Sequence, residues 1–261
     1  MPDAAVVADS LTYRIGDAVL VSEVHFEATP GSLIAVIGPN GAGKSTLLNL
    51  LAGNLRPSEG RVLLNGVDAS TALPGDLALA RSVLTQRSPI DIPFTAAQVV
   101  AMGRFPYRRD DANTSERDAA AVAEAMDRTD TAQFASRIYA TLSGGERTRV
   151  SLARVLAQDT PIVLLDEPTT ALDVAHEERI MGETVQLSRR QRAVIVVLHD
   201  LNAAAVHADQ IVVMNGGAIV ATGRPRQVLE ESLLSEVYRQ PMVVVDHPFR
   251  DCPLVLTADS R

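Results

Sequence analysis

The chain has 261 residues, of which 46% are hydrophobic and 21% are charged, and its formal net charge is −8. This size suits one α/β domain with a smaller subdomain, and the acidic balance gives no bulk reason to bind nucleic acid or anionic lipid. A lone cysteine, Cys252, excludes an internal disulfide. The start MPDAAVVADS lacks the features of a secretion signal, and the longest apolar runs are too short to span a bilayer, so we expect a cytoplasmic chain.

The first quarter of the chain predicts strands, a glycine-rich loop and a helix. Segments 5–16 and 18–28 have strand and turn patterns, and the apolar run SLIAVIG (32–38) suits a fully buried parallel strand. KSTLLNLLAGNL (44–55) predicts a helix with a leucine face, and RVLLNG (61–66) predicts another strand.

The middle of the chain changes character. Few β-branched runs occur between residues 88 and 158, while AAAVAEAMD (119–127) and ERTRVSLARVLAQ (146–158) are strongly helix-forming. We therefore interpret residues 1–261 as a single domain. A helical subdomain of about 88–158 is inserted into a core formed by about 1–87 and 159–261.

After this insertion the α/β pattern resumes. The expected elements are, in chain order, a strand in PIVLLDEP (161–168), a charged amphipathic helix (174–190), a strand in AVIVVLHD (193–200), a hairpin in 210–223 and a short helix in 228–239. The pair Asn215-Gly216 predicts the turn of the hairpin.

The sequence GPNGAGKST matches the phosphate-binding pattern G-x-x-x-x-G-K-[ST] in full, between a buried strand and a helix. The alternative, an ordinary glycine-rich turn, does not account for that context. Glycines let several backbone N–H groups point at phosphate oxygens, and the helix adds its positive end. The predicted ATP contacts are Gly38, Pro39, Asn40, Gly41, Ala42, Gly43, Lys44, Ser45 and Thr46. Among these, Lys44 can reach the β and γ phosphates and Ser45 can hold Mg²⁺.

A second motif, which is acidic, completes this site. PIVLLDEP delivers Asp166 and Glu167 to the C-terminal end of a buried strand, the end that faces the ligand in open α/β sheets. Asp166 is expected to bind Mg²⁺, directly or through water, and Glu167 to polarise the attacking water. Alone, a strand that ends in Asp-Glu is weak evidence, but with the phosphate loop it is strong.

These motifs and four others in the same order resemble the ATPase subunits of ABC transporters over nearly the whole chain. The other matches are Gln86 in SVLTQRS, the signature LSGGE at 142–146, Asp173 in TALD and His199 in VLHD. The resemblance implies a P-loop NTPase core of the RecA-like type, an N-terminal antiparallel β subdomain and an inserted α-helical subdomain. It also implies ATP and Mg²⁺ as cofactors.

The resemblance assigns a role to each match. Gln86 would contact Mg²⁺ or the attacking water, although Thr85 stands where the family often has proline. His199 would contact the γ-phosphate, and Tyr13, 25 residues before Gly38, would stack on adenine. The alternatives are a surface glutamine at 86 and a strand residue packed on its neighbours at 13. The remaining histidines are interpreted as structural: His25, His176, His207 and His247.

The signature has a feature that helix formation alone does not explain. Ser143 and Glu146 form the capping-box pattern S-x-x-E, but Gly144 and Gly145 are poor helix residues. A glycine-lined helix N-terminus with a serine hydroxyl is a second anion site. In the family, this motif closes on the nucleotide held by the other subunit. The resemblance therefore implies a homodimer in which Ser143, Gly144, Gly145, Glu146 and Asp173 act in trans.

The resemblance also indicates partners and a transported substrate. A separate integral-membrane permease dimer would dock near 88–109 and hold the chain at the cytoplasmic face of the membrane, with a substrate-binding protein acting indirectly. Segments 92–106 and 236–256 are similar to those of haemin-import ATPases, and less closely to those for iron–siderophores and cobalamin. We expect a type II importer ATPase for haem. An iron–siderophore or cobalamin importer ATPase and a soluble ABC ATPase of iron–sulfur cluster assembly are the alternatives.

Overall fold

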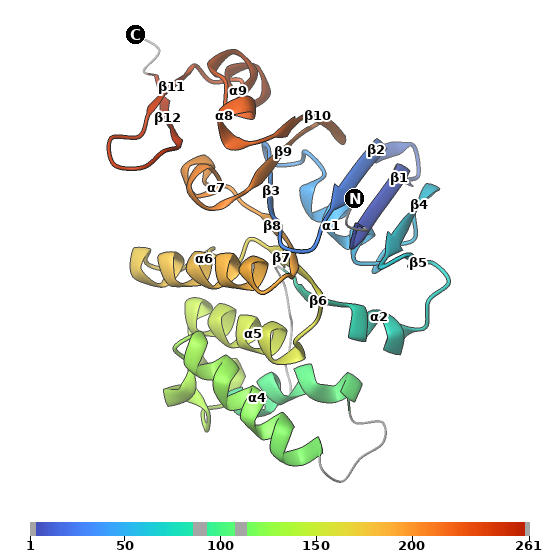
Figure 1. The fold of residues 1–261 in the computed structure, drawn as a ribbon, viewed down its shortest axis with the longest axis vertical. Helices are drawn as coiled ribbons and strands as arrows, with labels where there is room; N and C mark the ends of the chain where they lie inside the picture. The colour runs from blue at the N-terminus through green and yellow to red at the C-terminus, as the bar shows by residue number, and fades with distance from the viewer. Residues whose placement is uncertain (1–3, 86–92, 108–113, 259–261) are drawn as a thin grey trace.

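The computed structural model describes residues 4–85, 93–107 and 114–258, arranged around a central sheet (Figure 1). The sheet has the order β10-β9-β3-β8-β7-β6. Its strands are β3 (Leu33–Ile37), β6 (Arg81–Leu84), β7 (Ile162–Asp166), β8 (Ala193–Val197), β9 (Gln210–Asn215) and β10 (Ala218–Gly223). Only β10 is antiparallel to its neighbour. Every residue of β3, β7 and β8 is buried, which explains their continuous apolar sequences.

A second sheet, entirely antiparallel, lies beside the first (Figure 1). Its order is β2-β1-β4-β5, and its strands are β1 (Val6–Ile15), β2 (Ala18–Ala28), β4 (Glu59–Leu64) and β5 (Val67–Asp68). The C-terminal segment adds a hairpin of β11 (Met242–Asp246) and β12 (Pro253–Thr257).

Helices precede, connect and follow these strands. They are α1 (Lys44–Leu51), α2 (Pro74–Ala80), α3 (Ala96–Ala101), α4 (Thr114–Arg128), α5 (Gly144–Gln158), α6 (Val174–Arg189), α7 (Leu201–His207), α8 (Pro225–Val228) and α9 (Glu231–Tyr238). Short 3₁₀ helices span Met102–Tyr107, Ala132–Phe134 and Tyr139–Thr141. In the part of the chain that is described, no helix combines the length and apolar character needed to cross a bilayer.

The central sheet separates two hydrophobic cores. On β3, Leu33, Ala35 and Ile37 pack with helices α3 to α7, whereas Ile34 and Val36 pack with α1 and the antiparallel sheet. The alternation follows from the two-residue period of a strand. Helix α1 is thereby held between two sheets, with its leucines fully buried.

Most predicted elements are present, and the α/β architecture with an antiparallel β subdomain and helical insertions is confirmed. The signature helix begins at Gly144 and not at 146, because Ser143 already has the extended backbone of an N-cap. The hairpin turns at Gly216-Gly217, since Asn215 pairs with Ala218. The subdomain boundaries near 88 and 158 remain predictions.

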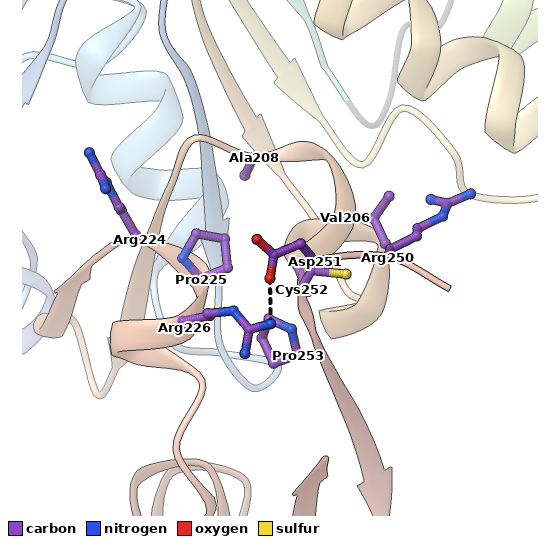
Figure 2. Close-up of a pocket in the computed structure, with 10 residues that line it drawn as sticks. Val206, Ala208, Arg224, Pro225, Arg226, Arg250, Asp251, Cys252 and Pro253 are labelled. Carbon is purple, nitrogen blue, oxygen red and sulfur yellow. Dashed lines mark hydrogen bonds and ion pairs between the residues drawn. The ribbon is translucent and has the colours of Figure 1, made fainter. Parts of the chain in front are cut away.

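A pocket of about 340 Å³ lies between α7, α8 and the C-terminal hairpin (Figure 2). Arg226 joins α8 to the hairpin segment, with Nη1 2.7 Å from Asp246 Oδ1 and Nη2 2.6 Å from Asp251 Oδ1. These carboxylates are almost fully exposed, so the bridge contributes little to stability. The sequence-predicted site residues lie elsewhere.

Candidate functional site

The phosphate-binding loop connects β3 to α1, and its shape depends on close backbone approaches. Gly43 is the N-cap of α1 with φ 95°, and a Cβ there would lie 2.5 Å from the carbonyl oxygen of Leu20. Only glycine fits such a left-handed, crowded position. The N–H of Gly217 donates to Ala42 O at 3.1 Å, so β2 and the β9–β10 turn both hold the loop.

Lys44, the first residue of α1, points back into this loop. Its side chain is buried, and Nζ donates to the carbonyl oxygens of Gly38 at 2.8 Å and Pro39 at 3.0 Å. Burial lowers the pKa of the Lys44 ammonium, while the negative charges of Glu167 and Asp166 act in the opposite direction. The loop therefore encloses a cation that faces two carboxylates.

Ser45 and Asp166 meet at the end of β7. The Ser45 hydroxyl donates to Asp166 Oδ1 at 3.1 Å, and the aspartate is only 4% exposed. Burial raises the pKa of the Asp166 carboxyl, and the hydrogen bond from Ser45 partly offsets this effect. A hydroxyl and a carboxylate oxygen side by side are hard ligands of the kind that Mg²⁺ takes, together with phosphate oxygens.

Glu167 has an uncommon backbone and a well-held side chain. Its φ is 50°, in the left-handed region that residues other than glycine rarely adopt, and its N–H donates to Val197 O at 3.1 Å. His199 Nε2 lies 2.5 Å from Oε1, and the Thr170 hydroxyl donates to Oε2 at 3.2 Å. Both strand ends, β7 and β8, thus converge on one carboxylate. The sequence interpretation missed Thr170, which follows Glu167 by three residues in the same turn.

The signature capping box is present in both halves. The N–H of Glu146 donates to Ser143 Oγ at 3.3 Å, and the N–H of Ser143 donates to Glu146 Oε2 at 2.7 Å. Arg137 Nη1 adds a contact to Glu146 Oε1 at 3.2 Å. The hydrogen bond from the Ser143 backbone is the main cause that lowers the pKa of the Glu146 carboxyl. Arg137 was not anticipated from the sequence.

The two signature glycines have different surroundings. A Cβ at Gly144 would meet nothing within 4 Å, whereas one at Gly145 would lie 3.0 Å from Ala171 O and 3.2 Å from Leu172 Cδ2. Gly144 leaves open space at the helix N-terminus, and Gly145 admits the backbone of a second loop. The presence of glycine at both positions therefore has a steric explanation.

That second loop ends at Asp173, the N-cap of α6. Its Oδ1 accepts the N–H of His176 at 2.9 Å and lies 2.7 Å from His176 Nδ1. The backbone hydrogen bond from His176 is the main cause that lowers the pKa of the Asp173 carboxyl. Signature and loop residues line a shallow pocket of about 340 Å³.

The predicted site residues therefore form two groups. One contains Lys44, Ser45, Asp166, Glu167 and His199, with Thr46 in the first turn of α1. The other contains Ser143, Gly144, Gly145, Glu146 and Asp173.

Two predicted residues need separate mention. Tyr13 is half-buried in β1 and packs against the core on the α1 side, so its packing alternative is observed and its adenine contact stays a prediction. Gln86 lies outside the described residues.

A phosphate loop on a buried strand, an acidic pair on a second strand and a separate serine–glycine helix start define an ATPase of the ABC class. A model of the ABC transporter family matches residues 21–170, and the chain belongs to this family.

Relatives extend the likeness over nearly the full length. The hemin import ATP-binding protein HmuV of Nocardia farcinica is 47% identical, over 91% of this chain and 82% of its own. The protein of the same name from Streptomyces coelicolor is 46% identical, over 95% of this chain and 88% of its own.

Solved structures share the fold. A transporter described as being of the metal-chelate type, in an inward-facing conformation, aligns with a TM-score of 0.82 at 23% identity, over 99% of this chain and 98% of its own. A dimeric ATP-binding cassette in a post-hydrolysis state, bound to ADP and Pi, aligns with a TM-score of 0.74 at 28% identity. That alignment covers 84% of this chain and 98% of the cassette.

Proposed function

We propose that this chain is the ATP-hydrolysing subunit of a haem importer and binds a separate permease dimer at the cytoplasmic face of the membrane. The observation that carries the ATPase activity is the convergence of Lys44, Ser45, Asp166, Glu167 and His199 beside the phosphate loop. The haem substrate is supported by relatives named hemin import ATP-binding proteins, which are 40–47% identical over most of this chain.

Within one subunit, each side chain has a defined task. Lys44 exchanges its two loop carbonyls for the β and γ phosphates, where its charge stabilises the transferring group. Glu167 is the general base for the attacking water, and Thr170 and His199 hold its carboxylate. His199 lies at the exposed mouth of the site, with a side chain that is 47% exposed, so it can turn to the γ-phosphate.

Magnesium would be held by Ser45 Oγ and Asp166, which already lie next to each other. The ion would neutralise charge on the phosphate oxygens. Gln86 is proposed as a further contact to the ion or the water, and Tyr13 as the adenine platform.

The second group of residues is proposed to act on the nucleotide of the partner subunit. Gly144 leaves the helix N-terminus open, and Ser143 offers a hydroxyl beside it, which suits the face of a γ-phosphate. Asp173 would complete the subunit contact. The cassette bound to ADP and Pi is dimeric, which supports a homodimer.

The permease is proposed to dock near residues 88–109, in the helical subdomain. Within the described part of this segment, Phe105 is 73% exposed, which suits an apolar contact with a partner.

ATP hydrolysis in a reconstituted transporter tests this proposal. The chain is assembled with its permease in liposomes and assayed with binding proteins loaded with haem, an iron–siderophore or cobalamin. Haem-loaded protein should stimulate phosphate release, and the other two should not. Stimulation by a siderophore- or cobalamin-loaded protein alone would replace haem as the substrate, and failure to hydrolyse ATP would overturn the proposal.

A further inference from the structure

The imidazole of His176 joins two acidic residues from different parts of the chain. Nδ1 lies 2.7 Å from Asp173 Oδ1, and Nε2 lies 3.6 Å from Asp130 Oδ2. Asp173 is the N-cap of α6, whereas Asp130 follows the end of α4. From the sequence this histidine was interpreted as structural, yet it spans the gap between the loop before α6 and the helical segment.

Asp130 is itself tied to the signature helix. Arg149 of α5 is buried, and its Nη1 donates to Asp130 Oδ2 at 2.9 Å and to the Asp130 carbonyl at 2.7 Å. The guanidinium also lies over the ring of Phe134, 5.5 Å from its centroid. A continuous path of contacts therefore runs from Asp173 through His176 and Asp130 to Arg149.

Three residues of this path, Asp173, His176 and Arg149, line the pocket that the signature and the loop share. The pocket is lined by Ser143, Gly144, Gly145, Glu146, Arg149, Ala171, Leu172, Asp173 and His176. Gly145 also lines this pocket, and its missing side chain lets the Ala171 carbonyl approach the start of α5. The loop before α6 and the signature helix are thus held together at this pocket by a close backbone approach and by the histidine.

We propose that His176 is a positioning residue that locks Asp173 to the signature helix, so that both elements meet the partner subunit's ATP as one unit. This inference rests on the proposed ATPase function. Ionised Asp173 and Asp130 can only accept, so both contacts are attractive when Nδ1 and Nε2 each carry a proton.

ATP hydrolysis by three variants of the full-length chain, assembled with its permease, tests the inference. His176→Ala removes both contacts, and His176→Asn keeps an amide nitrogen near the position of Nδ1. His25→Ala is the matched control, because His25 is an exposed histidine of β2 that lies outside the site. We expect His176→Ala to lower kcat about tenfold, the size expected for one hydrogen bond to a charged group, with KM for ATP nearly unchanged.

His176→Asn should recover part of the lost kcat, and His25→Ala should behave as wild type.

Three outcomes would overturn the inference. Normal kcat in His176→Ala, while Ser143→Arg abolishes hydrolysis, would leave the proposed function standing and remove His176 from it. If His176→Ala lowers the thermal midpoint enough to account for its loss of kcat, His176 would contribute to the stability of the fold only. A wild-type assembly without ATPase activity would overturn the proposed function and this inference together.

Discussion

At the residue scale, Glu167 stands out because its surroundings fix it in an unfavourable conformation. A left-handed backbone costs a residue other than glycine about 1–3 kcal/mol, and such strain concentrates at functional sites. The N–H bond to Val197 and the side-chain contacts with His199 and Thr170 hold the residue there. Its carboxylate is thus oriented in advance of substrate binding.

Glu167→Gln should retain ATP binding and lose hydrolysis by about 10²–10⁴-fold, the usual contribution of a general base. Glutamine preserves the shape but cannot accept the proton. Equilibrium binding of ATP and steady-state phosphate release measure the two effects separately. Hydrolysis at the wild-type rate would remove Glu167 from the role of base.

Lys44→Ala should weaken ATP binding without weakening the nucleotide-free fold. Burial of the ammonium lowers its pKa, so the charge is no asset to the empty chain. The free energy of unfolding without nucleotide should stay within about 1 kcal/mol of wild type, while the rise in thermal midpoint on adding ATP should disappear. An undiminished increase would contradict the assignment of the phosphate loop.

At the scale of elements, the two glycines at the start of α5 should respond differently to substitution. Gly144→Ala places a methyl group in open space on a helix and should leave stability equal or raise it by up to about 1 kcal/mol. Gly145→Ala presses on the Ala171 carbonyl and should lower stability. Urea denaturation of the matched pair measures this difference, and equal free energies of unfolding would contradict the steric explanation.

Helix α9 carries a pH-dependent contribution to stability. The Tyr238 hydroxyl is buried near the backbone of Gly38, and burial raises the pKa of Tyr238 to about 12 from the ordinary 10.0. The raised pKa means that the contribution is complete below pH 10 and is lost as the pH rises from about 10 to about 12, by about 2–3 kcal/mol. Tyr238→Phe should show a shallower decline over this range in thermal melts, and parallel declines would refute the assignment.

How far the sequence predicts these elements depends on burial. The runs that became β3, β7 and β8 are buried on both faces and have unmistakable patterns. Strand β6 was not predicted, because RSVL is a four-residue edge strand with only alternate residues buried. Helix α7 was also missed, since it has seven residues and depends on the Asp200 N-cap.

The same limit applies to the site. Its motif residues could be identified from spacing, and the contacts among Lys44, Ser45, Asp166 and Glu167 agree with that identification. Thr170, Arg137 and His176 could not, because their relevance depends on which distant segments the fold brings together.

At the scale of the whole molecule, the proposed dimer makes each ATP site the product of two chains. Lys44→Ala damages the phosphate loop, and Ser143→Arg damages the signature. A homodimer of either variant therefore contains no complete site. A mixed dimer has one intact site, formed by the phosphate loop of one chain and the signature of the other. An equal mixture of the two variants should therefore recover hydrolysis, up to about a quarter of the wild-type rate, from assemblies that are separately inactive.

Phosphate release before and after mixing measures this recovery, with each variant at twice its concentration as the control. Wild-type activity in Ser143→Arg alone would show that the signature is not needed in trans.

The alternating packing of β3 also has an evolutionary consequence. Leu33, Ala35 and Ile37 share one core with helices of the signature side, and Ile34 and Val36 share the other with α1 and the antiparallel sheet. Neighbouring side chains on this strand thus pack against different sets of residues. Across descendants of this chain, substitutions at residues 33, 35 and 37 should be compensated on the signature side of the sheet. Substitutions at residues 34 and 36 should be compensated on the side of α1, so adjacent residues of one strand should coevolve with different partners.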